Sequence, residues 1–188
     1  MKGSTMTAGK HERGKAGASA AENGHHAGDA RLADEIRVHH ATMVAELERI
    51  TAALREAGPG HEATARDQVQ QWYSEVLVPH ADEEEATTYA AAGELAEGRL
   101  LIEGMVQEHG LIKRLVGHFG RSDGAAAAAY ATAVLEAFDS HQRKENELIL
   151  PLLVHSPEVS LTEVMGGGHG HQLDGGDQAA DPGGHAHH

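Results

Sequence analysis

The chain has 188 residues, enough for one domain of ordinary size with a tail at each end. Its 15 Lys and Arg residues stand against 29 Asp and Glu residues, and the formal net charge of −14 disfavours binding to nucleic acid or to an anionic membrane surface. The absence of Cys excludes disulfides, thiolate zinc sites and cysteine nucleophiles. No apolar run is long enough to cross a bilayer and no secretory signal is recognisable, so we expect a cytoplasmic protein.

Two segments lack apolar periodicity. We interpret residues 1–28, which are rich in Gly, Ala, Ser and Lys, as a disordered N-terminal tail. Residues 157–188 are acidic and contain Gly- and His-rich tracts, and we interpret them as a disordered C-terminal tail. The His-rich tracts fit a flexible solubilising tail or a weak metal-capturing arm. The folded domain is then expected over 29–156.

The periodicity between the tails is helical, and nothing there indicates a strand. A first helix is predicted over about 29–56, before the Gly58-Pro59-Gly60 segment. A second helix is predicted over about 62–91. Pro79 lies inside it and should kink or divide it, because proline lacks the backbone N–H of a regular helix.

Two more helices follow. The third is predicted over about 99–119 and stops at Gly120. The fourth is predicted over about 123–153, with Ser122 as its N-cap. Four long helices joined by short links predict an all-α fold, an antiparallel up-down-up-down four-helix bundle with a disordered tail at each end.

Each predicted helix has one apolar stripe with spacings of three and four residues, the face expected to point into the bundle core. Every stripe is interrupted by a His, and two stripes also carry a Glu four residues later. A His and a Glu at this spacing lie on one helix face, one turn apart. The residues at these positions are His40, His80, Glu84, His109, His141 and Glu145.

Six polar residues in a core are costly if they remain unsatisfied, and two buried carboxylates without counter-charge are costlier still. A metal centre removes both penalties, because the carboxylates and imidazoles become ligands. Four imidazoles and two carboxylates exceed the needs of one tetrahedral zinc ion and suit two ions bridged by the carboxylates. Nitrogen and oxygen donors favour iron, with manganese or zinc as alternatives.

Three positions leave alternatives open. His39 competes with His40, and Glu83 could replace Glu84 as the inward carboxylate. Lys113 either points outward or approaches the centre, where an ammonium group beside metal ions would be unfavourable. Any single core His is more often structural than a ligand. The coincidence of all six residues on the stripes favours a metal site.

The order His, His-x-x-x-Glu, His, His-x-x-x-Glu on four helices resembles the haemerythrin-like (HHE cation-binding) family. The strings VPHADEEEATTY, VQEHGLIKRL and SHQRKENELILPLL agree with it, and the resemblance covers about 29–156. It implies a non-haem di-iron site with terminal histidines and bridging glutamates. The implied terminal ligands are His40, His80, His109 and His141, and the implied bridging ligands are Glu84 and Glu145.

The chain departs from the oxygen-carrying members of this family. Those members have a second ligand His one turn after the third-helix His, where this chain has Lys113. Their last carboxylate is typically an Asp at a longer spacing, whereas here Glu145 follows His141 by four residues. The pattern is closer to members with four His and two Glu, which are associated with responses to oxygen, nitric oxide or peroxide and with iron handling.

The resemblance therefore implies a metal-cation protein that binds or senses a small oxidant such as oxygen, nitric oxide or peroxide. The alternatives are a di-iron enzyme acting on peroxide, nitric oxide or Fe(II), an iron storage or buffering protein, and a plain structural bundle. We expect a small gaseous or peroxide ligand as the partner, and neither nucleic acid nor a membrane. The sequence names no protein partner, oligomeric state or native metal.

Overall fold

The computed structural model describes residues 13–167, which are helical apart from short connections and contain no strand. Among them, no helix is both long and apolar enough to cross a membrane. In chain order the elements are α1 (Arg13–Glu56), α2 (Glu62–Trp72), the π-helical turn η1 (Tyr73–Leu77), α3 (Val78–Ala86), α4 (Thr88–Glu94), α5 (Arg99–Gly120), α6 (Gly124–Lys144), the π-helical turn η2 (Glu145–Ile149), α7 (Leu150–His155) and α8 (Leu161–Gly167).

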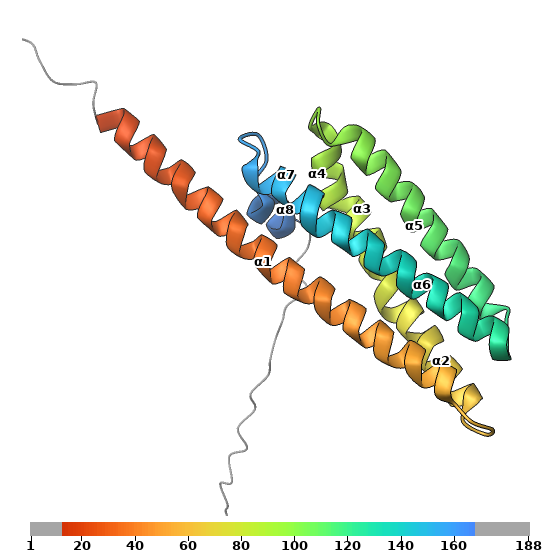
Figure 1. Cartoon of the computed structure of the whole chain (residues 1–188). Helices are drawn as coiled ribbons and strands as arrows, with labels where there is room; N and C mark the ends of the chain where they lie inside the picture. Colours follow the sequence, from red (N-terminus) through yellow and green to blue (C-terminus); the bar gives the residue numbers. More distant parts are fainter. Residues whose placement is uncertain (1–12, 168–188) are drawn as a thin grey trace, which may run out of the picture.

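Four helical segments pack side by side, namely α1, α2 to α4, α5, and α6 to α7, and the chain reverses direction between them (Figure 1). Helix α6 packs against both α5 and α1, and α1 also packs against α2. The first reversal passes through Gly60, whose φ of 91° is readily adopted only by a residue without a Cβ. The starts and ends of the predicted second, third and fourth helices agree with the structure to within about three residues.

The core consists of two apolar clusters. The first, called the Phe138 cluster, includes Met43, Leu47, Ile50, Leu54, Val69, Tyr73, Leu77, Ile112, Phe119, Val134 and Phe138. The second, called the Leu153 cluster, includes Ala33, Tyr89, Ala92, Leu95, Ile102, Met105, Ile149, Leu150, Leu153 and Leu161.

A polar layer separates these two clusters. In α5, His109 lies between Met105 of the Leu153 cluster and Ile112 of the Phe138 cluster. In α6, His141 follows Phe138 by less than one turn, at the edge of the other cluster. The predicted polar positions therefore occupy one level across the four segments, with an apolar half on either side.

Two π-helical turns shift the apolar stripes by one residue. Counted with α-helical spacing, the predicted stripe through His141 and Glu145 continues to Leu148, which is 49% exposed, whereas its neighbour Ile149 is 1% exposed. A π turn accommodates one more residue than an α turn, so a stripe counted with α-helical spacing leaves the core beyond it. The same shift in η1 buries Leu77 in place of Val76.

Each π turn precedes a proline, Pro79 at the start of α3 and Pro151 at the start of α7. In a regular α-helix a proline lacks the N–H that would bond the carbonyl four residues earlier, and its ring clashes with that carbonyl. In both places here that carbonyl belongs to a residue of the π turn. The predicted second helix is thus divided at Pro79, as expected. It is divided again at Thr87, whose φ of −120° and ψ of −89° are not helical.

Two elements extend beyond the predicted domain of 29–156. Helix α1 begins at Arg13 rather than at residue 29, and α8 follows residue 156. Asp29 holds the start of α8 against α1, because it is 2% exposed and accepts hydrogen bonds from the backbone nitrogen and hydroxyl of Thr162, at 2.8 and 2.9 Å. Leu161 then packs fully buried in the Leu153 cluster. Residues 1–12 and 168–188, including the predicted His-rich tracts, lie outside the described residues.

Candidate metal centre

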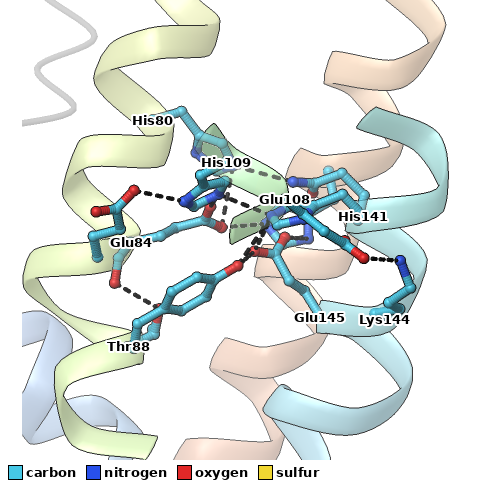
Figure 2. Close-up of polar contacts among 12 residues, drawn as sticks. His80, Glu84, Thr88, Glu108, His109, His141, Lys144 and Glu145 are labelled. Atoms are coloured by element: carbon cyan, nitrogen blue, oxygen red, sulfur yellow. Dashed lines mark hydrogen bonds and ion pairs between the residues drawn. The ribbon is translucent and has the colours of Figure 1, made fainter. Parts of the chain in front are cut away.

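The six polar residues of the predicted stripes meet in the layer between the two clusters. Figure 2 labels all of them except His40. Five of them are at most 9% exposed, and His80 is half-buried. They come from all four helical segments, since α1 supplies one, α3 two, α5 one, and the junction of α6 with η2 the last two. In the order of these elements they are His40, His80, Glu84, His109, His141 and Glu145.

Their donor atoms form two groups that share both carboxylates, and the atoms within each group lie within 4.8 Å of one another. One group adds His40 and His80 to the two glutamates, and the other adds His109 and His141. We call these groups the His40 position and the His109 position.

Glu84 directs one oxygen toward each position. Its Oε1 lies 3.4 Å from Nε2 of His40 and 3.1 Å from Nε2 of His80. Its Oε2 lies 3.6 Å from Nε2 of His109. Glu145 repeats the arrangement, with Oε1 at 3.2 Å from His141 Nε2 and Oε2 at 3.9 Å from His40 Nδ1. Glu84 therefore has the orientation of a bridging group, and Glu145 also belongs to both groups of donor atoms.

Three of the histidines have an oxygen partner on Nδ1. His40 Nδ1 donates to the side-chain oxygen of Asn146 at 2.9 Å, and His109 Nδ1 donates to Glu85 at 2.9 Å. His141 Nδ1 donates to Glu108 at 3.1 Å. A proton on Nδ1 leaves Nε2 as a lone pair, which is the tautomer of a metal-binding imidazole.

These tautomers bring lone pairs together. Nε2 of His109 and Nε2 of His141 lie 2.8 Å apart, and neither carries a hydrogen when both Nδ1 atoms donate outward. In addition, Oε2 of Glu84 and Oε2 of Glu145 are buried without a hydrogen-bond partner. Buried lone pairs facing one another are costly unless a cation or a proton lies between them. The donor set therefore fits bound metal cations.

The neighbouring charges determine the pKa values in the layer. Burial raises the pKa of Glu84, but the imidazoles of His109, His40 and His80 beside it outweigh the burial and hold this pKa well below its usual range. Burial lowers the pKa of His80, but Glu84 raises it above its ordinary value. Burial also lowers the pKa of His141, but Glu145 raises it above its ordinary value. Protons therefore compete with metal ions for the same nitrogen atoms.

Lysines neutralise the outer carboxylates. Lys144 Nζ donates to Glu108 at 2.6 Å (Figure 2), and Lys113 Nζ donates to Glu85 at 3.1 Å and to Asp82 at 2.7 Å. Lys113 thus points away from the donor atoms, which decides between the two predicted orientations. Burial would lower the pKa of Lys113, but the two carboxylates raise it.

The other two open positions are also decided by burial. His40 is 2% exposed and faces the centre, whereas His39 is exposed. Glu84 is buried in the donor set, and Glu83 is exposed. The inward positions are therefore those that the stripes favour.

Tyr89 also touches the donor atoms and was not predicted from the sequence. Its ring stacks on His109, with centroids 5.2 Å apart and planes at 7°, and it is 2% exposed. Its hydroxyl donates to Oε1 of Glu145 and lies 3.0 Å from Nε2 of His141. Burial raises the pKa of Tyr89, and Glu145 and Glu84 raise it further. A regular helical stripe misses this residue, because the interruption at Thr87 turns it inward. The sequence feature that could have pointed to it is the presence of one of the three tyrosines of the chain five residues after Glu84.

The outer partners were also missed, because they lie beside the stripes rather than on them. They are Glu85, Glu108, Asn146 and Gln142. Gln142 is 2% exposed, its Nε2 lies 3.4 Å from Nε2 of His80, and its Oε1 has no hydrogen-bond partner. A groove of about 350 Å³ between α1 and α6 is lined by Gln142, Asn146 and His40, so one residue of the His40 position forms part of its wall.

The comparison with known proteins agrees with this geometry. No curated protein and no solved structure matches the chain. The family model described as the hemerythrin HHE cation-binding domain matches residues 31–153, a range that contains all six residues of the donor set. The chain belongs to the hemerythrin HHE cation-binding domain family.

Proposed function

We propose that this protein holds two metal cations, one at the His40 position and one at the His109 position, with Glu84 and Glu145 bridging them. The observation that carries the proposal is that each carboxylate directs one oxygen to each position. Iron is the proposed metal, because imidazole nitrogen and carboxylate oxygen donors without thiolates suit it, and manganese and zinc are the alternatives. The surrounding architecture in this proposal is an antiparallel four-helix bundle.

We further propose that the protein binds or senses a small oxidant such as oxygen, nitric oxide or peroxide in the cytoplasm. A pair of iron(II) ions would supply the electrons that such a molecule accepts. The side chains support access on one side, since the groove between α1 and α6 reaches His40. The buried amide of Gln142, with an unpartnered oxygen, can hydrogen-bond a small polar molecule there.

The test is anaerobic loading of the full chain with Fe(II), followed by metal analysis and by absorption spectra before and after exposure to air. His40→Ala and His39→Ala form a matched pair, because these neighbours on α1 differ in burial and in contact with Glu84. Circular dichroism shows whether each variant folds. We expect two irons per chain in the wild type and in His39→Ala, and near-ultraviolet charge-transfer bands on oxidation.

His40→Ala should bind less iron and lose these bands. Equal iron content and equal spectra in the two variants would refute the two-metal assignment, since metal would then bind elsewhere, for example to exposed histidines. Sustained consumption of peroxide or nitric oxide by the loaded protein would indicate an enzyme rather than a binding protein.

A further inference from the structure

The hydroxyl of Tyr89 lies among the donor atoms of the His109 position. It is 3.0 Å from Nε2 of His141 and donates to Oε1 of Glu145, so it touches two atoms that the proposed site assigns to one metal ion. The ring is held by its stacking on His109 and by its place in the buried Leu153 cluster. The hydroxyl therefore has little freedom to turn away.

The spacing of these atoms is that of neighbouring ligands on one ion. Metal bonds to nitrogen or oxygen of roughly 2.0–2.2 Å at right angles place adjacent ligand atoms about 3 Å apart. Nε2 of His141 lies 2.8 Å from Nε2 of His109, 3.2 Å from Oε1 of Glu145 and 3.0 Å from the hydroxyl of Tyr89. The tyrosine oxygen thus lies at the same separation as the atoms already assigned as ligands.

The His40 position has a different set of neighbours. There the nearest additional groups are the amides of Gln142 and Asn146, and Asn146 is already bonded to Nδ1 of His40. A neutral amide is a weaker donor than a phenolate for a hard, highly charged ion. The two positions are therefore chemically unequal, although they share both bridging carboxylates.

We propose that Tyr89 is a seventh protein ligand of the centre and binds the metal at the His109 position through its phenolate oxygen. This inference rests on the proposed two-metal site. Binding breaks the phenol O–H bond and forms the oxygen–metal bond, and the proton passes to solvent. The His109 position then has five protein donors and the His40 position has four. The His40 position, one residue of which lines the groove between α1 and α6, then has the fewer protein donors.

The experiment uses the full chain loaded with two irons and oxidised to iron(III). Iron(III) bound to a phenolate has a visible charge-transfer band, and Raman excitation in that band enhances tyrosine ring vibrations. The chain offers two matched controls, because its other tyrosines are Tyr73 and Tyr130. Tyr73 lies in the Phe138 cluster and Tyr130 stacks on His118, so neither touches the donor set.

We expect the band and the enhanced ring vibrations in the wild type, in Tyr73→Phe and in Tyr130→Phe. Tyr89→Phe should still bind two irons and lose both signals. Wild-type protein labelled with ring-deuterated tyrosine should show shifted vibrations, which tests for a phenolate without relying on a variant that folds.

Two irons per chain without enhanced tyrosine vibrations would overturn the assignment of Tyr89 and leave the two-metal site intact. Signals that persist in Tyr89→Phe would also overturn it. A wild-type chain that does not bind two irons would overturn the two-metal proposal, and the inference on Tyr89 with it. The two failures are therefore distinguished by the iron content alone.

Discussion

Replacement of Glu108 tests whether the outer carboxylates prepare the histidines for metal binding. Glu108 accepts from Nδ1 of His141 at 3.1 Å and from Lys144 at 2.6 Å, and it touches none of the proposed ligand oxygens. Glu108→Ala removes the partner that fixes the tautomer and orientation of His141. Loss of such a partner typically weakens metal binding by about 10–100-fold, which corresponds to roughly 1.4–2.8 kcal/mol.

The size of the effect should depend on what remains of the hydrogen bond. Glu108→Gln keeps an oxygen that can accept from Nδ1 but loses the negative charge, so its effect should be smaller than that of Glu108→Ala. Glu103→Gln is the matched control, because Glu103 lies on the same helix α5 and is exposed. It should leave the affinity unchanged.

The assay is a competition titration of Fe(II) or Zn²⁺ between each variant and a chelator of known affinity, with the second equivalent of metal analysed separately from the first. Only the site at the His109 position should weaken, since His141 belongs to that group. An affinity for Glu108→Ala within about twofold of the wild-type value would refute the reasoning, because the fall expected from losing the partner is at least about tenfold.

Four further predictions concern pH and the fold. Metal affinity should fall as the pH drops through the raised pKa values of His80 and His141, above their ordinary 6.5, because protons then occupy the ligand nitrogens; the same competition titration repeated across neutral pH measures this. Metal-free protein should conversely lose the stabilisation from these two groups as the pH rises through those values, seen as a lower urea midpoint. Ile149→Ala should reduce the free energy of unfolding by about 2–5 kcal/mol, whereas Leu148→Ala should change it by no more than about 0.5 kcal/mol, and equal effects would refute the register of η2. Asp29→Ala should expose α8 to limited proteolysis, because it removes the acceptor for the backbone nitrogen of Thr162.

The positions of the six donor residues could be predicted, because no irregular turn lies within either His–Glu pair. His40 and His109 are in uninterrupted stretches of α1 and α5. His80 and Glu84 both follow η1, so their mutual spacing is intact, and His141 and Glu145 both precede the extra residue of η2. Local periodicity is therefore sufficient for the pairs, and the packing brings them to one level.

The register after the π turns, the inward position of Tyr89 and the docking of α8 could not be predicted from helical periodicity. Leu148 was assigned to the core because an α-helical count does not anticipate the π turn before Pro151. Tyr89 required knowledge of the break at Thr87. Asp29 and α8 meet across more than a hundred residues of chain, and neither end of that contact has a local signature. Contacts of this kind are determined by tertiary packing rather than by the spacing of residues along one helix.

The charges around the centre indicate what kind of small molecule it can accept. Glu108 is paired with Lys144, and Glu85 is paired with Lys113, which also contacts the exposed Asp82, so lysines offset most of the charge of the carboxylates that orient the histidines. In the proposed site the carboxylates of Glu84 and Glu145 would supply two negative charges, half of those needed to balance two divalent cations. A phenolate from Tyr89 would raise the negative charge of the ligands to three, still less than the four positive charges of two divalent cations. The loaded centre would thus retain positive charge in a layer buried between two apolar clusters, and this favours a small molecule that becomes anionic when it accepts electrons from the metals.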